Sequence, residues 1–374
     1  MKKAFIACIL ALCMLVAGCS CNGAVTLSFN NKWHGGTIQT GYTETTTYSV
    51  TFKNDFIDGD DFNYKQNEEV ATYFVPMFNQ GEYTSTVTVI DQSAVPSHIQ
   101  SDVLDLDATT RSPIIKQTTS FSISGEYIPT NGEKVAFNDT AQTESYFRLT
   151  DTSLAPIYSE TISVMYFPSI NTKDDLKGIK VNEEKVATVF LYNKSEYSVK
   201  QYTNKKDSNR FDEYMTDKTS AVPTIEREID YSYRSVIDNT ALLFALRNVN
   251  VTANAQSSTS ILATSPAYKV STQLNVKCYQ TKNQTVDSAL KLNDVDIDDN
   301  VEIPVNCLSF AINAQNSGRD QLVYVQNNIV KNADEQIIIP NKALLTKYVT
   351  PLVEYGSYYL MGVLEYNLTS VSIA

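Results

Sequence analysis

Histidine, tryptophan, glycine and proline are all scarce in this sequence, with two His, one Trp, 13 Gly and 11 Pro among 374 residues. Two histidines cannot supply a three-histidine metal site, and they leave little room for histidine-based acid–base catalysis. The shortage of Gly and Pro excludes a collagen-like or low-complexity chain. Basic residues are also in deficit, with 30 Lys and Arg against 42 Asp and Glu, and the formal charge is −12. Nucleic-acid binding needs clustered Lys and Arg, so no nucleic-acid partner is expected.

Motifs that carry catalytic chemistry are missing as well. The sequence has no G-x-S-x-G nucleophile elbow, no phosphate-binding loop and no dinucleotide-binding fingerprint. A Ser–His–acid site would need His34 or His98 as its base. The absence of a C-x-x-C pair argues against a redox enzyme or a zinc ribbon. We therefore expect a protein that is not an enzyme and that uses no cofactor and no metal.

The N-terminus has the layout of an export signal. Two lysines precede an apolar run over residues 4–17, which suits a signal peptide and is too short to span a bilayer, a task that takes ~20 residues. The run ends in Leu15-Val16-Ala17-Gly18-Cys19, which resembles the lipobox of bacterial lipoproteins. The resemblance implies cleavage between Gly18 and Cys19 and attachment of fatty acids such as palmitate to Cys19. The alternative is an ordinary secretory signal with a chance cysteine.

This signal predicts where the protein resides. Residues 1–18 would be the signal peptide and 19–23 a lipidated tether, so that the chain is anchored to the cell membrane through Cys19 and faces the extracytoplasmic side. Several acyl chains together give durable anchoring, whereas one chain is marginal. Because the body is acidic, anionic lipid head groups repel it, and we expect it to stand off the bilayer.

Two cysteines lie in the body of the chain, Cys278 and Cys307. Each falls in a strand-like segment, and the segment between them is polar and acidic. Paired antiparallel strands can bring two cysteines opposite each other, and an exported protein meets oxidising conditions. We predict a disulfide between them, with two separate buried thiols as the alternative.

Apolar and polar residues alternate with a period of two along most of the chain, which is typical of half-buried β-strands. The clearest segments are 25–29, 43–52, 83–90, 118–127, 144–149, 158–167, 186–192, 197–202, 259–262, 269–279, 321–326, 336–339 and 357–371. Several exceed ten residues and are separated by polar loops. The sequence therefore predicts an all-β fold, a large curved antiparallel sheet in the form of a half-open roll or barrel.

Helical signal is confined to two short segments. Residues 239–247, with Asp238 as N-cap, are apolar on all faces, and 342–349 is a weaker candidate. A change in composition near 93–113 suggests an N-terminal β region at 24–95 and a main body at 114–374. The two could equally form one continuous sheet.

The order of elements in the body, roughly 120–374, is similar to that of uncharacterised exported β-roll proteins. It comprises a strand that ends at Pro156, the short helix at 238–247, a long polar β region around Cys307 and a final strand through 364–368. The resemblance carries no diagnostic motif and implies a fold, with no known activity.

Three further features are weighed as sites. Asp294, Asp296 and Asp298 imitate the start of a calcium loop, but positions 6 and 12 of that loop are Asp299 and Val305 instead of Gly and Glu, so a solvated loop is expected. A second acidic cluster, 54–61, is expected to be a loop too, although paired carboxylates from both clusters could meet in a glycosidase-like cleft. Trp33, which precedes His34 and a Gly pair, is expected to be a packing residue at a sheet edge or in a loop, with a ligand contact as the alternative.

Tyrosine is abundant, with 23 residues. Twelve of them recur on expected strands, where aromatic side chains on one face of a curved sheet could line a ligand groove. They are Tyr146, Tyr158, Tyr166, Tyr192, Tyr197, Tyr202, Tyr231, Tyr233, Tyr355, Tyr358, Tyr359 and Tyr366. Two functions follow as hypotheses: non-enzymatic binding of an apolar or glycan ligand, or assembly with another envelope protein through exposed strand edges. An apolar pocket of several hundred Å³ would favour the binding hypothesis, and a flat, filled interior would favour assembly.

Overall fold

The computed structural model describes the greater part of the chain. The described residues are 25–26, 33, 39–53, 74–99, 114–129, 133–149, 154–169, 180–192, 197–204, 209–229, 237–238, 242–249, 256–262, 272–285, 290–297, 301–312, 321–332, 334–354 and 359–374. All structural statements below concern these residues.

One 19-stranded sheet and a separate two-stranded hairpin contain the described strands. In the order in which they pair, the main strands are β10 (Ile225–Ile229), β9 (Tyr197–Thr203), β8 (Lys180–Tyr192), β7 (Leu154–Ser169), β6 (Val135–Leu149), β5 (Ile114–Pro129), β4 (Gly81–Ile90), β2 (Thr43–Lys53), β21 (Tyr359–Ile373), β20 (Leu345–Glu354), β17 (Gln321–Gln326), β16 (Glu302–Ile312), β13 (Thr272–Thr285) and β12 (Gln256–Leu262). Each of these neighbouring pairs is antiparallel.

Short strands pair at the margins of the sheet. They are β1 (Val25–Thr26) and β11 (Ile237–Asp238) beside β12, β3 (Phe74–Phe78) beside β5, and β14 (Lys291–Leu292) between β15 (Val295–Asp296) and β21. The hairpin is β18 (Val330–Lys331) with β19 (Ile337–Ile339). Three short helices, η1 (Gln92–Ala94), α4 (Arg210–Thr216) and α5 (Leu242–Arg247), complete the described structure.

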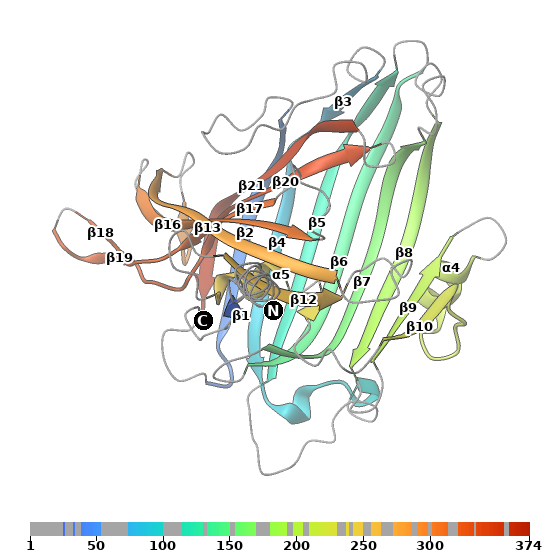
Figure 1. Ribbon diagram of the computed structural model, residues 1–374, viewed down its shortest axis with the longest axis horizontal. Coiled ribbons are helices and arrows are strands. Elements are labelled where there is room, and N and C mark those ends of the chain that lie inside the picture. The colour runs from blue at the N-terminus through green and yellow to red at the C-terminus, as the bar shows by residue number, and fades with distance from the viewer. Residues whose placement is uncertain are drawn as a thin grey trace, which may run out of the picture.

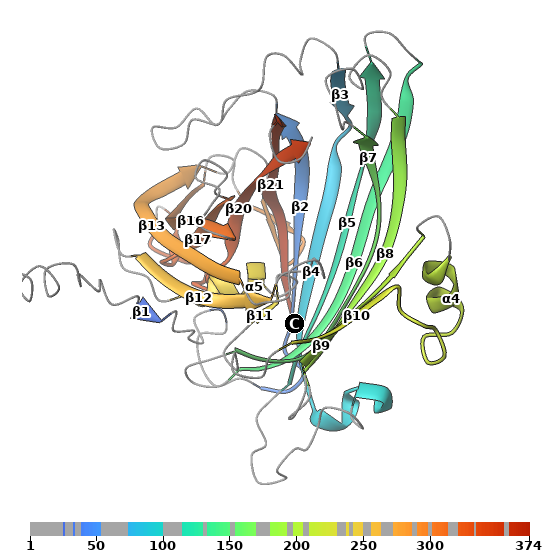
Figure 2. The same cartoon turned by 45° about the vertical axis from the view of Figure 1, so that its right-hand side comes forward.

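Long strands form a tall wall at the centre of the molecule (Figure 1). β5, β6, β7 and β8 are 16, 15, 16 and 13 residues long, against a usual strand length of ~5–6 residues. From one edge of this wall the sheet rolls over, so that β12, β13, β16 and β17 lie in front of one face, while α4 and η1 lie on the opposite side (Figure 2). The expected large, curved antiparallel sheet is thus confirmed. We call the covered face the inner face and the other the outer face.

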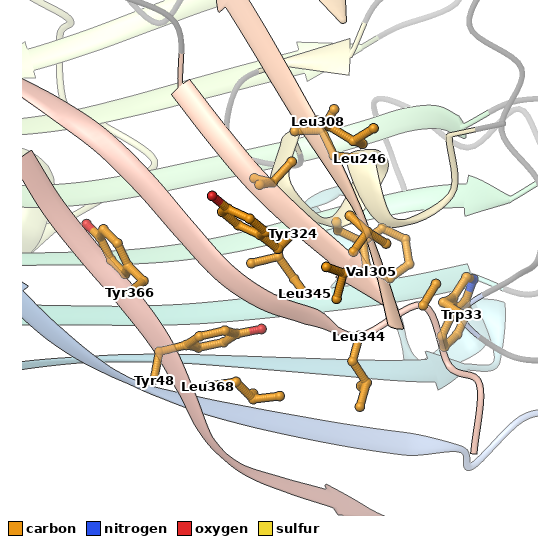
Figure 3. Close-up of a cluster of buried hydrophobic side chains, with 14 of the residues drawn as sticks. Trp33, Tyr48, Leu246, Val305, Leu308, Tyr324, Leu344, Leu345, Tyr366 and Leu368 are labelled. Atoms are coloured by element: carbon orange, nitrogen blue, oxygen red, sulfur yellow. The ribbon is translucent and has the colours of Figure 1, made fainter. Parts of the chain in front are cut away.

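Period-2 patterning decides which side chains enter each face. Along β2 the side chains at 44, 46, 48 and 50 are buried on the inner face, and those at 43, 45, 47 and 49 are half-buried on the outer face. The inner face meets the main hydrophobic core, which includes Tyr48, Tyr324, Leu345 and Tyr366 (Figure 3). The outer face has a smaller core near its β7–β9 end, beneath η1 and α4.

Helix α5 lies inside the roll, as expected for a short helix with apolar residues on all its faces. Leu242, Phe244 and Leu246 are buried in the main core. The helix also carries Arg247, which is 6% exposed and forms a bidentate ion pair with Glu44 of β2, at 2.6 and 3.1 Å. Two further donors bond the carbonyl oxygens of Lys342 and Ala343. The buried charge is therefore paired and also hydrogen-bonded to backbone, which offsets the cost of burying it.

One expected helix is wrong, and one observed helix was not expected. Residues 342–349, expected as a helix, lie mainly in strand β20, which is paired on both sides by β17 and β21. The β-branched residues Thr346, Val349 and Thr350 suit that pairing, and tertiary contacts outweigh the weak helical signal. Helix α4 has no counterpart among the expected elements. Its signals are the N-cap Asn209, whose side chain accepts from the Asp212 backbone amide, and acidic residues in the first turn.

The N-terminal β region at 24–95 is continuous with the body at 114–374. β2 pairs with the C-terminal strand β21, and β4 pairs with both β2 and β5. The composition shift near 93–113 therefore lies between two neighbouring strands of a single sheet.

Cys278 and Cys307 lie on neighbouring antiparallel strands, β13 and β16, but they do not face each other. A bulge at Tyr279 places Cys278 opposite Leu308 and Cys307 opposite Gln280. Both side chains are buried, and both are present as thiols in place of the expected disulfide. The register of β13 against β16 is the physical reason: on neither side of the bulge would it place Cys278 opposite Cys307, so the two cysteines are diagonal neighbours. Burial raises the pKa of the Cys278 thiol above its usual value.

Candidate functional site

Side chains of the main core fill most of the inside of the roll among the described residues. A cavity with a volume of about 20 Å³ lies between α5 and the inner face. Its lining includes Tyr48, Tyr83, Tyr348 and Tyr366. A single water needs ~10–15 Å³ by that measure, and pockets for organic ligands measure ~300–1,000 Å³. Gln117, 2% exposed, has a side-chain oxygen without a hydrogen-bond partner at this cavity. The cavity therefore has room for ordered water and not for an apolar ligand.

A second pocket among the rolled strands measures about 130 Å³. It is lined by the amide side chains of Asn306, Gln326, Asn327 and Asn341, which bond to each other and to nearby backbone: Asn327 donates to Asn306, and Gln326 bonds four backbone groups. These amides satisfy one another and hold the β19–β20 connection in place.

A larger hollow lies on the outer face. This cleft measures about 400 Å³. Its floor consists of two rows of side chains that cross four paired strands, β4, β5, β6 and β7. One row is Thr86, Thr118, Glu144 and Glu160, and the other is Thr84, Ser120, Gln142 and Ile162. The side chains share a face because each row joins residues that are directly opposite in the antiparallel register. Hydroxyl, amide and carboxylate groups thus make up almost the whole floor.

Two carboxylates face each other in this floor. Glu144 and Glu160 are directly opposite on β6 and β7, an arrangement that repels unless other charges offset it. Each has a lysine and a tyrosine as partners. Glu160 lies 2.7 Å from Lys218 and accepts from Tyr214 at 2.5 Å. Glu144 lies 3.5 Å from Lys116 and accepts from the Tyr146 hydroxyl.

Helix α4 positions one side of the cleft. Phe211 and Tyr214 of α4 are buried in the outer core, where the Tyr214 ring stacks on Tyr202 of β9 at 4.1 Å between centroids. Burial and the hydrogen bond to Glu160 raise the pKa of Tyr214 far above its usual value, so its phenol stays protonated and donates. The chain then leaves the helix and brings Lys218, with its side chain 49% exposed, over the end of the floor.

The acidic run at 293–300 is a hairpin turn where it is described. Asn293 and Asp294 have φ of 49° and 64°, values that a type I′ turn requires at both central residues. The Asn293 side chain accepts from the Ile373 backbone amide at 2.7 Å, so the turn docks on the end of β21. Asp298, Asp299, the cluster at 54–61, His34, and Gly18 and Cys19 lie outside the described residues.

The described aromatic residues are divided between the two cores of the sheet. Trp33 is fully buried and packs edge-on against Tyr42 and Phe244, with centroids 5.4 and 5.3 Å apart, so it packs as expected. Of the tyrosines considered as a groove lining, Tyr146, Tyr158 and Tyr202 enter the outer core, and Tyr366 enters the inner core. His98 is exposed and lies against the Tyr158 ring. Tyr231, Tyr233, Tyr355 and Tyr358 lie outside the described residues.

Within the described part of the chain, no group of three or more His, Cys, Asp or Glu side chains is arranged to hold a metal ion. Among the described helices, none has the length and apolar character needed to cross a bilayer. The cleft floor, by contrast, was not predictable before the register was known, because its two rows draw on four strands that lie up to 78 residues apart in the chain, from Thr84 to Ile162.

No protein-family model matches the sequence, and no curated protein matches it. Among solved structures, the chain is similar to the crystal structure of a beta-barrel-like protein of a domain of unknown function, DUF1849, from Brucella abortus. The TM-score is 0.41 and the sequence identity 5%, over 90% of this chain and 100% of that chain. A likeness this distant carries no argument about function.

Proposed function

We propose that this protein is a lipid-anchored, extracytoplasmic binding protein, without enzymatic activity, whose outer-face cleft takes a polyhydroxylated ligand such as a glycan. The observation that carries the proposal is the cleft floor itself: about 400 Å³ of space above hydroxyl, amide and carboxylate side chains.

The chemistry of that floor favours a glycan over an apolar ligand. Each Ser or Thr hydroxyl can donate one hydrogen bond and accept two, and Gln142 adds both kinds of group. An apolar ligand would strip water from these groups and leave them unsatisfied, at ~1–3 kcal/mol for each buried group. A sugar replaces the lost water with its own hydroxyls. The cavity beneath α5, of about 20 Å³, has no room for a lipid, which also counts against an apolar ligand. A filled interior taken alone would favour assembly, and the cleft on the outer face is the feature that favours binding instead.

Assembly through a strand edge has less support. β10, which pairs with β9 at one margin of the described sheet, carries Glu226, Arg227 and Glu228 in succession. Charged residues on an edge strand oppose pairing with another chain.

The anchor rests on the lipobox alone. Replacing Cys19→Ala is expected to abolish labelling by a fatty-acid probe and to move the protein from the detergent phase to the aqueous phase. Labelling of the variant at the wild-type level would refute the anchor and leave the cleft proposal unaffected.

Ligand binding is tested with the detergent-extracted full chain on a panel of immobilised neutral, amino and uronic glycans. We expect wild type to be retained by at least one class and the Gln142→Leu variant to be retained less. Gln142 is an exposed residue of the cleft floor. The matched control is Gln280→Leu, the same change at an exposed strand position on β13. Absence of retention, or equal retention of the two variants, would refute the proposal.

A further inference from the structure

The polar rows of the cleft continue beyond it. Thr45 and Thr47 of β2 are opposite Thr86 and Thr84, and on the far side of β2 the register reaches β21. There Thr45 is opposite Ser372, and Thr47 is opposite Ser370. Both rows therefore run without interruption across β21, β2, β4 and β5 as Ser or Thr at each position. On β6 and β7 one row then continues as Glu144 and Glu160, and the other as Gln142 and Ile162.

We name this strip the hydroxyl track. Its members share the outer face and bear a hydroxyl; they are Ser370, Ser372, Thr45, Thr47, Thr84, Thr86, Thr118 and Ser120. Six strands, from β21 to β7, have five spacings of ~4.8 Å between them, so the track and the cleft floor together are about 24 Å long. The two rows are two residues apart along each strand, which makes the strip ~7 Å wide.

The track is accessible in the described structure. Its hydroxyl residues are half-buried or exposed, whereas their sequence neighbours Glu44, Thr46, Val87 and Val371 are buried on the inner face. The Thr45 and Thr86 hydroxyls lie 3.0 Å apart and bond each other. Neighbouring hydroxyls in a row are thus close enough to act on the same ligand group.

From this geometry, and resting on the proposed function, we propose that the ligand is an extended linear glycan that lies across the strands, along the hydroxyl track and into the cleft. A single sugar would use only the cleft. A strip that is several times longer than it is wide, with the same chemistry repeated at every strand, matches a polymer whose hydroxyl groups also repeat. The carboxylates and Lys218 occupy one end only, so the two ends of the strip are chemically different.

The inference predicts that affinity grows with chain length. The probes are cello-, chito- and malto-oligosaccharides of one to six units, titrated into the detergent-extracted full chain by calorimetry. In at least one series we expect the hexasaccharide to bind more than tenfold more tightly than the disaccharide. Equal affinity for the two would overturn the linear-chain inference while a cleft that binds sugars survives. Absence of binding in all three series would overturn the inference and count against the glycan proposal as well.

Variants locate the extra affinity on the track. The double substitution Thr45→Val and Thr47→Val removes two hydroxyls outside the cleft and keeps the β-branched shape. Since each hydrogen bond changes affinity by about two- to tenfold, we expect a several-fold loss for the hexasaccharide and an unchanged disaccharide. Thr281→Val, on β13, is the matched control, since it too removes an exposed hydroxyl that bonds a neighbouring strand. If the double variant does not fold, Ser372→Ala at the far, exposed end of the track replaces it. A hexasaccharide affinity equal to wild type in these variants would refute the track.

Discussion

Asp139 on β6 is a buried carboxylate whose removal should stabilise the protein at neutral pH. It is 7% exposed, and its side-chain oxygen accepts from the Tyr166 backbone amide at 2.8 Å, at the point where the pairing of β6 with β7 ends. Burial raises the pKa of this carboxyl from 3.8 to about 6, although the hydrogen bond from Tyr166 opposes the shift. The charged form therefore costs free energy in the folded protein.

The size and sign of the effect follow from the two pKa values. Because the folded pKa is the higher one, the folded state binds more protons than the unfolded state between about pH 4 and pH 6, and stability falls as pH rises through that window. Above pH 6 both states are ionised and the full penalty applies. The difference between the folded and unfolded pKa of Asp139 corresponds to ~3 kcal/mol of unfolding free energy, which is an upper limit for this site.

Asp139→Asn keeps the oxygen that accepts from Tyr166 and removes the charge. We expect the variant to be more stable than wild type by ~1–3 kcal/mol at pH 7.5, and the difference to shrink to near zero by pH 4. The measurement is urea unfolding of both proteins at several pH values, in which other titrating groups cancel in the difference. A variant that is less stable at pH 7.5, or a difference that does not depend on pH, would show that the carboxylate is not penalised by burial.

Two further predictions concern the inner core. Arg247→Met should destabilise the protein by ~3–5 kcal/mol, because it leaves the Glu44 carboxylate buried without its charge partner. Adding Glu44→Leu should recover part of that loss, and urea unfolding of the two single variants and the double variant measures both effects. If the second substitution recovers no stability, the two side chains do not form a stabilising ion pair. Cys278 and Cys307 should both react with a thiol reagent in denaturant without prior reduction and neither should react in the folded state, since both are buried; peptide mapping that finds the pair oxidised would contradict the structure.

The alternation of apolar and polar residues predicted the strands of the sheet, but it did not predict the cleft. Segments such as 43–52 and 83–90 have mainly period-2 patterns, and because a strand's pattern is local, their strands could be placed from the sequence. Register is not local. The disulfide prediction was wrong because the register of β13 against β16 places Cys278 opposite Leu308 and Cys307 opposite Gln280, which the sequence does not reveal. The helix predicted at 342–349 was wrong because the pairing of this segment with β17 and β21 holds it as a strand.

The cleft depended on register in the same way. Thr84 and Ser120 are ordinary outward residues in the sequence, and only the pairing of β4 with β5 makes them neighbours. A signal was present nonetheless: most outward positions of β2 and β4 are Thr, whereas a solvated sheet face more often carries a mixture of charged residues. That bias, combined with a register, would have indicated the site.

The pairing of β2 with β21 has a consequence for how the chain folds. The two strands lie side by side in the middle of the sheet, and the bond between Lys53 and Glu365 joins residues 312 positions apart. Contacts this remote in sequence form slowly, because the loop between them must close first. Among the described strands, the pairing of β2 with β21 is the one that joins the two halves of the sheet. The roll therefore cannot form until β21, a strand of 15 residues, is available to pair. Truncation of that strand should leave an open edge at β2 and a chain prone to aggregate rather than a smaller stable fold.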